Sequence, residues 1–134
     1  MNRLSDKEAI DLLKHGDILE LGQQANKIRQ EKHPGNTVTF IVDRNINYTN
    51  VCLNECRFCA FFRRENRKDA YLLPIETILQ KVKETQEAGG TQVMLQGGLH
   101  PSLPFEYYLN MINTIKTAFP DIVIHAFSPA EILH

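Results

Sequence analysis

The chain has 134 residues, of which 43% are hydrophobic and 23% are charged, and this composition is that of an ordinary globular protein. Its formal net charge of −1 provides no excess of basic residues, which argues against nucleic-acid partners and against attraction to an anionic membrane. No apolar run approaches the roughly 18 residues that cross a bilayer, and the charged N-terminus lacks the apolar core of a signal peptide, so we expect a cytoplasmic protein.

A helical lead-in opens the chain. Helices are predicted near residues 6–14 and 18–32, and a Pro-Gly pair within residues 33–36 ends the second one. Each helix begins with a pair of residues spaced like a capping box, Ser5 with Glu8 and Asp17 with Glu20. We therefore expect a helical N-terminal extension over residues 1–36.

Strands and helices alternate in the rest of the chain. Runs of β-branched and other apolar residues predict strands at residues 37–42, 91–96 and 122–127. Prolines mark the starts of the predicted helices at Pro74, Pro104 and Pro129. Because strands that alternate with helices form parallel sheets, residues 37–134 are predicted to have an α/β fold with about three strand–helix units.

The only cysteines of the chain gather in one C-x₃-C-x₂-C motif made of Cys52, Cys56 and Cys59. Cysteine thiolates are the usual ligands of iron–sulfur clusters, and three of them leave one iron of a [4Fe–4S] cube open for chemistry. A non-catalytic iron–sulfur module for electron transfer or binding is an alternative, and so is a disulfide that leaves the third cysteine unpaired. A structural zinc site is another, with a fourth ligand from His33, His100 or His125.

Three segments with chemical potential leave the predicted strands at the same end. The cysteine motif follows the first strand, the Gly97-Gly98 turn follows the second, and Ser128 follows the third. Active sites of α/β barrels lie at the carboxyl ends of the strands, so we expect a site there. A glycine pair also suits any tight turn, and Ser128 with Glu131 also forms a capping-box pattern. Three residues near the end of the first strand are further candidates for substrate contact: Asp43, Asn45 and Tyr48.

The cysteine motif, with the aromatic Phe58 before its last cysteine, resembles the signature of the radical S-adenosylmethionine (SAM) enzymes. The segment Gln96-Gly97-Gly98 resembles the glycine motif of that superfamily. Within the superfamily, several flanking segments resemble the dehypoxanthine futalosine cyclases of menaquinone biosynthesis, namely residues 43–52, 58–61, 89–92 and 125–129. The similarity extends over essentially the whole chain.

This resemblance implies two cofactors, a [4Fe–4S] cluster bound by the three cysteines and SAM bound at its open iron. It implies that the backbone of Gln96-Gly97-Gly98 receives the SAM amino group. Phe58 would shield the cluster or pack beside the adenine, and Ser128 would reach the SAM carboxylate or ribose. The implied reaction begins with a 5′-deoxyadenosyl radical that abstracts hydrogen from a small nucleoside substrate, and it ends with ring closure to cyclic dehypoxanthine futalosine.

Two sister families share much of this pattern, the aminofutalosine synthases and the radical enzymes of deazaflavin (FO) synthesis. We favour the cyclase because of Asn47-Tyr48 and of Gln96 before the glycine pair. The radical reaction also needs an external one-electron donor of the flavodoxin or ferredoxin type. A basic stretch beside the cysteines suits docking of such an acidic protein, and it consists of Arg57, Arg63, Arg64, Arg67 and Lys68.

The length of the chain bears on its fold. A complete (β/α)₈ barrel takes about 250 residues, whereas this chain has 134. We therefore expect residues 37–134 to be the first, incomplete part of a radical SAM TIM-type barrel. A partial barrel lacks later strands of the substrate pocket, so we expect the isolated polypeptide to be inactive.

Overall fold

The computed structural model describes residues 3–134; Met1 and Asn2, which open the predicted helical extension, lie outside them. The chain divides into two compact units, one ending at Thr39 and the other running from Phe40 to His134. No helix of the described residues is long and apolar enough to cross a membrane.

The first unit contains two helices, α1 (Asp6–His15) and α2 (Ile18–Lys32), which confirms both helices predicted from the sequence. At the start of α1, the Ser5 hydroxyl accepts from the Glu8 amide and the Glu8 carboxylate accepts from the Ser5 amide at 2.8 Å, so a full capping box forms. At the start of α2, the Asp17 carboxylate accepts from two backbone amides. Neither helix has a fully buried residue.

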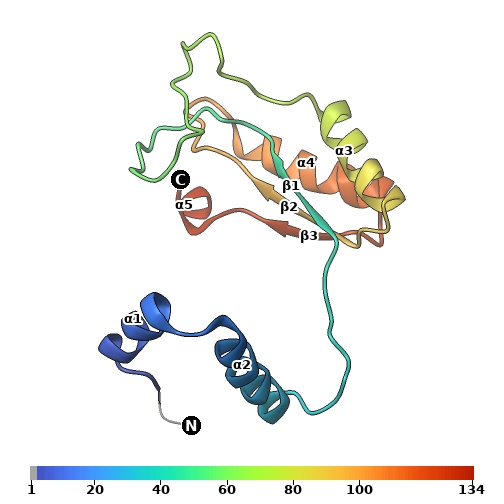
Figure 1. Cartoon of the computed structure of the whole chain (residues 1–134). Coiled ribbons are helices and arrows are strands. Elements are labelled where there is room, and N and C mark those ends of the chain that lie inside the picture. The colour runs from blue at the N-terminus through green and yellow to red at the C-terminus, as the bar shows by residue number, and fades with distance from the viewer. Residues whose placement is uncertain (1–2) are drawn as a thin grey trace. The chain divides into compact units, whose positions relative to one another are not determined.

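The second unit is a three-stranded sheet with helices, as Figure 1 shows. Its elements in chain order are β1 (Asp43–Asn47), α3 (Ile75–Glu87), β2 (Gln92–Gln96), α4 (Phe105–Ala118), β3 (Val123–Ala126) and α5 (Pro129–Leu133). The strands lie in the order β1-β2-β3 and all pair in parallel. This arrangement confirms the predicted α/β class.

The prediction of the first strand was wrong in position. Residues 37–42 contain no strand, and β1 begins at Asp43. The apolar side chains of the predicted run are exposed, with Phe40 at 87%. In contrast, Ile46 is buried at 1% and pairs with Leu95 of β2. β-propensity is a weak guide where a strand must also find a partner and a core, and only β1 finds both.

The core of the second unit lies between one face of the sheet and the helices α3 and α4, which Figure 1 shows on the same side. Strand residues alternate between the two faces, so Ile46, Val93 and Leu95 all point into this core. The helices contribute Ile78, Val82, Met111 and Ile115. The opposite face of the sheet is more polar, with side chains that include Asn45, Asn47, Gln96 and His125.

Candidate functional site

The cysteines lie on a loop that follows β1 and folds back on itself. The Cys52 amide donates to the Arg63 carbonyl at 3.0 Å, and the Arg63 amide donates to the Asn50 carbonyl at 2.7 Å. Within the loop, the Cys59 amide donates to the Cys56 carbonyl at 2.9 Å. The loop is therefore closed at its base, and it holds all three thiols, none of them in a disulfide.

Two polar residues just before the cysteines fasten this loop to the segment that leads to α3. The Asn50 side chain donates to the Asp69 carbonyl and accepts from the Tyr71 amide, both at 2.8 Å. It therefore satisfies two backbone groups of that segment, as a neighbouring strand would. The buried Thr49 hydroxyl donates to the Tyr71 carbonyl at 2.6 Å. No local pattern in the sequence points to Tyr71, because contacts with residues distant in the sequence bring it to the site.

The Gly97-Gly98 turn lies directly against the base of the cysteine loop. A Cβ on Gly97 would overlap the ring of Tyr48, and a Cβ on Gly98 would overlap the Val51 carbonyl and lie 2.7 Å from the Cys52 Cβ. Only residues without a side chain allow this approach of the two segments. The resemblance places these glycines against SAM. The structure shows that they also lie against the protein itself, at Tyr48, Val51 and Cys52.

Backbone amides at the turn bind the cysteine loop. The Gly98 amide donates to the Thr49 carbonyl at 3.2 Å, and the Leu99 amide donates to the Cys52 sulfur at 3.3 Å. The Leu53 amide in turn donates to the Leu99 carbonyl at 2.9 Å. Hydrogen bonds to cysteine sulfur are among the features by which proteins tune iron–sulfur clusters, so the Leu99 contact fits a ligand role for Cys52.

Ser128 is the N-cap of α5, and its partner Glu131 also contacts residues outside this cap. The Ser128 amide donates to Glu131 Oε2 at 2.7 Å, as in a capping box. The other carboxylate oxygen accepts from the Gly97 amide at 3.0 Å and from the Tyr48 hydroxyl at 2.5 Å. The sequence indicated only the local cap, because Tyr48 and Glu131 lie 83 positions apart.

Tyr48 lies against Gly97 and is fully buried. Burial, followed by the hydrogen bond to Glu131, raises the pKa of the Tyr48 phenol far above its ordinary value. The phenol therefore stays protonated and acts as a donor. Neither Tyr48 nor Asp43, which stands at the opposite end of β1, lines the nearby cavity, so the substrate contact expected of them stays a prediction. Asn45, the third residue of that group, lines the cavity described next.

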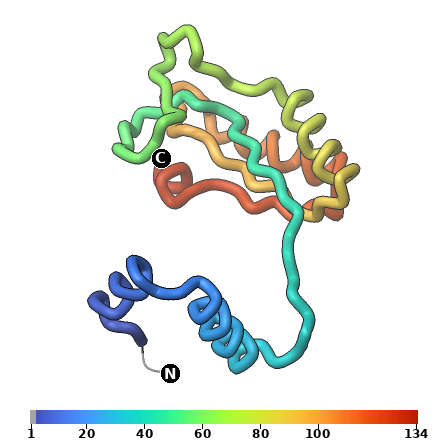
Figure 2. The backbone as a smooth tube through the Cα atoms, in the orientation of Figure 1, coloured from blue at the N-terminus to red at the C-terminus, as the bar shows by residue number. Residues whose placement is uncertain are grey.

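A cavity of about 610 Å³ opens where these segments meet, a size typical of small-molecule sites. All eight site residues predicted from the sequence line it: Cys52, Cys56, Phe58, Cys59, Gln96, Gly97, Gly98 and Ser128. Aromatic Phe61 and Tyr71 and the amides Asn45 and Asn47 add to the lining. Figure 2 lets the reader follow the three segments that carry these residues beyond the strands.

The donor set fits a cluster better than a single ion. No three His, Cys, Asp or Glu side chains of residues 3–134 are grouped so as to hold one metal ion. Each thiolate of a cubane binds a different iron, so the cysteines need not converge on one point. His100 is buried at 8% and accepts from the Ser102 amide through Nδ1, and it does not line the cavity. The zinc alternative therefore finds no support in the second unit.

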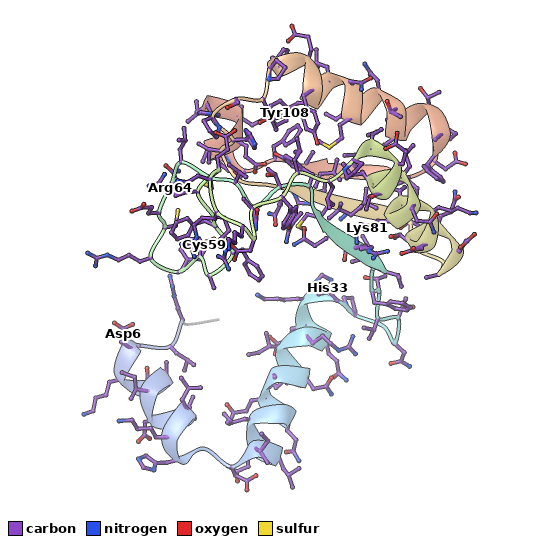
Figure 3. The ribbon with its side chains drawn as sticks, turned by 90° about the horizontal axis from the view of Figure 1, so that it is seen from above. Asp6, His33, Cys59, Arg64, Lys81 and Tyr108 are labelled. Atoms are coloured by element: carbon purple, nitrogen blue, oxygen red, sulfur yellow. The ribbon has the colours of Figure 1, made fainter. Side chains whose placement is uncertain are left out.

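Two arginines of the basic stretch are used within the loop. Arg63 forms an ion pair with Asp69, and this hydrogen bond lowers the pKa of the Asp69 carboxyl. Arg64 forms an ion pair with Glu55 and also donates to the Leu53 carbonyl at 3.0 Å. Figure 3 shows Cys59 and Arg64 on the same side of the second unit, away from Lys81 of α3. The Arg63 and Arg64 side chains therefore stabilise the cysteine loop through contacts with other residues of the same segment.

Comparison with known proteins gives one family and two kinds of relative. The protein-family model of the radical SAM superfamily matches residues 46–133 of this chain. A cyclic dehypoxanthine futalosine synthase of Halalkalibacterium halodurans is 44% identical over 130 residues, which are 97% of this chain and 35% of that protein. The corresponding synthase of Streptomyces coelicolor is 40% identical over 135 residues, 98% of this chain and 34% of the relative.

The second kind of relative carries another name. A 5-amino-6-(D-ribitylamino)uracil–L-tyrosine 4-hydroxyphenyl transferase of Methanopyrus kandleri is 53% identical over 98 residues, which are 73% of this chain and 27% of that protein. The chain thus spans about a third of the length of the curated relatives it matches. The two names describe different reactions.

Proposed function

Since this chain belongs to the radical SAM superfamily, whose members use a [4Fe–4S] cluster and SAM, we propose that its three cysteines each bind one iron of that cluster. The observation that carries the proposal is the shared cavity, which brings Cys52, Cys56 and Cys59 together with the glycine turn of β2. The hydrogen bond from Leu99 to the Cys52 sulfur supports it. Residues 37–134 are then the first part of a TIM-type barrel that follows a helical extension over residues 1–36.

SAM lies, in this proposal, beside the Gln96-Gly97-Gly98 segment, with Phe58 and Ser128 at its edges. The amides of Gly97 and Gly98 already donate to Glu131 and Thr49, so the turn offers a ligand its carbonyl oxygens. Carbonyl oxygens suit the amino group of SAM, which is a donor. Bound together, the reduced cluster and SAM supply a 5′-deoxyadenosyl radical, and the protein orients the substrate and excludes competing reactions.

The reaction we propose is the cyclisation of dehypoxanthine futalosine to cyclic dehypoxanthine futalosine, on the route to menaquinone. Support comes from the relative of that name that matches 97% of the chain, and from the residues Asn47, Tyr48 and Gln96 that favoured it in the sequence. Asn45, Asn47 and Gln96 place amide groups in the cavity, where they can donate to and accept from a polar nucleoside.

A second candidate is the FO-synthase type of reaction, in which a 4-hydroxyphenyl group of tyrosine is transferred to 5-amino-6-(D-ribitylamino)uracil. The 53% identity over 98 residues to a protein of that name favours it. The same cysteines, glycine turn and cavity would serve both reactions, because both begin with the same cofactors.

Substrate trials on the anaerobically reconstituted protein decide between these reactions, using the longest native polypeptide that carries this chain. Formation of 5′-deoxyadenosine is measured with SAM plus dehypoxanthine futalosine, and separately with SAM, tyrosine and the ribitylaminouracil. We expect turnover only with the first substrate; turnover only with the second pair would replace the cyclase by the transferase. No 5′-deoxyadenosine with either would refute both reactions, and zinc in place of iron would refute the radical function as a whole.

We also propose a flavodoxin or ferredoxin as the electron donor. Three basic residues near the cluster loop, Arg57, Arg67 and Lys68, are exposed and form no ion pair within the described part of the chain. We call them the docking patch. Positive charges at such a surface speed encounter with an acidic partner, and salt weakens the effect.

A further inference from the structure

We propose that Glu131 is a positioning residue, which holds the glycine turn of β2 in register with the end of β1 and so shapes the place where SAM binds. This inference rests on the proposed function. The carboxylate of Glu131 contacts the segments that leave all three strands: Tyr48 after β1, Gly97 after β2, and Ser128 after β3.

The sheet itself does not hold these segments together. Its ladder ends at Asn47 paired with Gln96 on one side of β2, and at Leu95 paired with Ala126 on the other. Beyond these pairs, alignment depends on contacts outside the sheet ladder. A carboxylate can accept about four hydrogen bonds, and Glu131 accepts one on Oε2 and two on Oε1. Backbone bonds join these segments in pairs, from Gly98 to Thr49 and from Phe127 to Leu95, whereas the Glu131 side chain contacts all three and so extends the alignment of the sheet into the site.

The donor that follows β1, Tyr48, is held in place by its packing. The Tyr48 ring packs edge-on against Tyr108 and Phe127, with centroids 6.1 and 6.3 Å away. It also lies directly against Gly97, where a Cβ would overlap it. The Tyr48 ring can therefore contact the glycine turn in only a narrow range of relative positions. The hydrogen bond from its hydroxyl to Glu131 fixes one position within that range.

The backbone just before α5 is strained at Phe127, which indicates that contacts with the rest of the fold hold this segment in place. Phe127 has a φ of 66°, a left-handed conformation that is uncommon for a bulky residue. Its amide donates to the Leu95 carbonyl at 3.0 Å, and its ring packs on Tyr48 and Tyr108. Such strain persists where surrounding contacts over-determine the backbone, often at ligand sites.

The chain contains a natural comparison for this role. Glu8 occupies the same position of a capping box at α1, yet within residues 3–134 its carboxylate accepts only from Ser5, at the amide and at the hydroxyl. The Glu131 carboxylate accepts locally from the Ser128 amide and, in addition, from two distant donors, Tyr48 and Gly97. A glutamate needed only for a cap would lack these long-range contacts, so Glu8→Gln is a matched control for Glu131→Gln.

The test uses Glu131→Gln, Tyr48→Phe and Glu8→Gln in the longest native polypeptide, reconstituted anaerobically. Gln keeps one oxygen and gains donor hydrogens, so at least one of the three donors loses its acceptor. Tyr48→Phe removes only the phenol donor and retains the ring. Two readouts are taken: iron and sulfide per chain, and the SAM dissociation constant from the change that SAM causes in the EPR spectrum of the reduced cluster.

We expect Glu131→Gln to weaken SAM binding about 10-fold and Tyr48→Phe to weaken it severalfold, with iron and sulfide content retained. Glu8→Gln should match the wild type in both readouts. Unchanged SAM affinity in both site variants would overturn the positioning role, and so would loss of iron in both, which would mark Glu131 as a residue of the fold alone. A wild-type spectrum that SAM does not change would instead refute the proposed function.

Discussion

Gly98→Ala is the substitution that most directly tests the close contact between the β2 turn and the cysteine loop. The added methyl would overlap the Val51 carbonyl and stand 2.7 Å from the Cys52 Cβ, whereas carbon atoms in contact normally lie about 3.5–4.0 Å apart. The turn and the loop must therefore separate by roughly 1 Å. Both neighbours are close to the main chain, so no flexible side chain can move aside instead.

The expected cost follows from two effects. Overpacking in a tight site costs about 1–3 kcal/mol. Separation also weakens hydrogen bonds across the contact, such as the one from the Gly98 amide to the Thr49 carbonyl, at about 1 kcal/mol each. We expect a loss of about 2–4 kcal/mol in the free energy of unfolding, which lowers Tm by at least about 10 °C for a unit of this size. Displacement of Cys52 should also reduce the iron bound after reconstitution.

Thermal unfolding and iron content are the two measurements, and Gly22→Ala is the control. Gly22 lies within α2, and apart from the adjoining chain and helix backbone no atom of residues 3–134 lies within 4 Å of its Cβ position, so alanine fits and favours the helix. That variant should retain full iron content and the Tm of the second unit. If Gly98→Ala matched the wild type in stability and iron, the contact between turn and loop would not be as tight as we infer.

Three other predictions concern the core, the loop and the donor. Leu95→Ala, at a fully buried position, should cost about 2–5 kcal/mol in chemical denaturation, whereas Leu133→Ala, 87% exposed, should cost little. The Arg63 hydrogen bond lowers the pKa of Asp69, so the ion pair stabilises the loop above the ordinary pKa of aspartate, and this stabilisation is lost as pH falls through the lowered pKa. In the wild type, proteolysis of the loop should therefore rise only in acid. In Asp69→Asn, which lacks the ion pair, it should already be raised at neutral pH. Reversing the docking patch to glutamate should slow reduction by a flavodoxin without changing reduction by dithionite, and added salt should then speed that reduction because it screens a repulsion. An unchanged rate would show that the patch is ordinary surface.

Local sequence signals predicted most of the secondary structure. The Ser5 capping box and the helix opened by Pro74 depend on neighbours a few positions away, and the structure confirms both elements. The first strand shows the limit of such signals, because residues 37–42 have the composition of a strand but are exposed. The polar segment Asp43–Asn47 became β1 because it pairs with β2 and buries Ile46.

The sequence by itself determined the chemical character of this protein: three closely spaced thiols, a glycine turn and the order of strands and helices, all of which follow from residue type and spacing along the chain. Only the tertiary structure decided that Glu131 joins Tyr48 to Gly97, and that Gly98 must lie against Cys52. The reason is physical. Contacts between residues tens of positions apart depend on how parallel strands end together in space, and no local pattern encodes that distance.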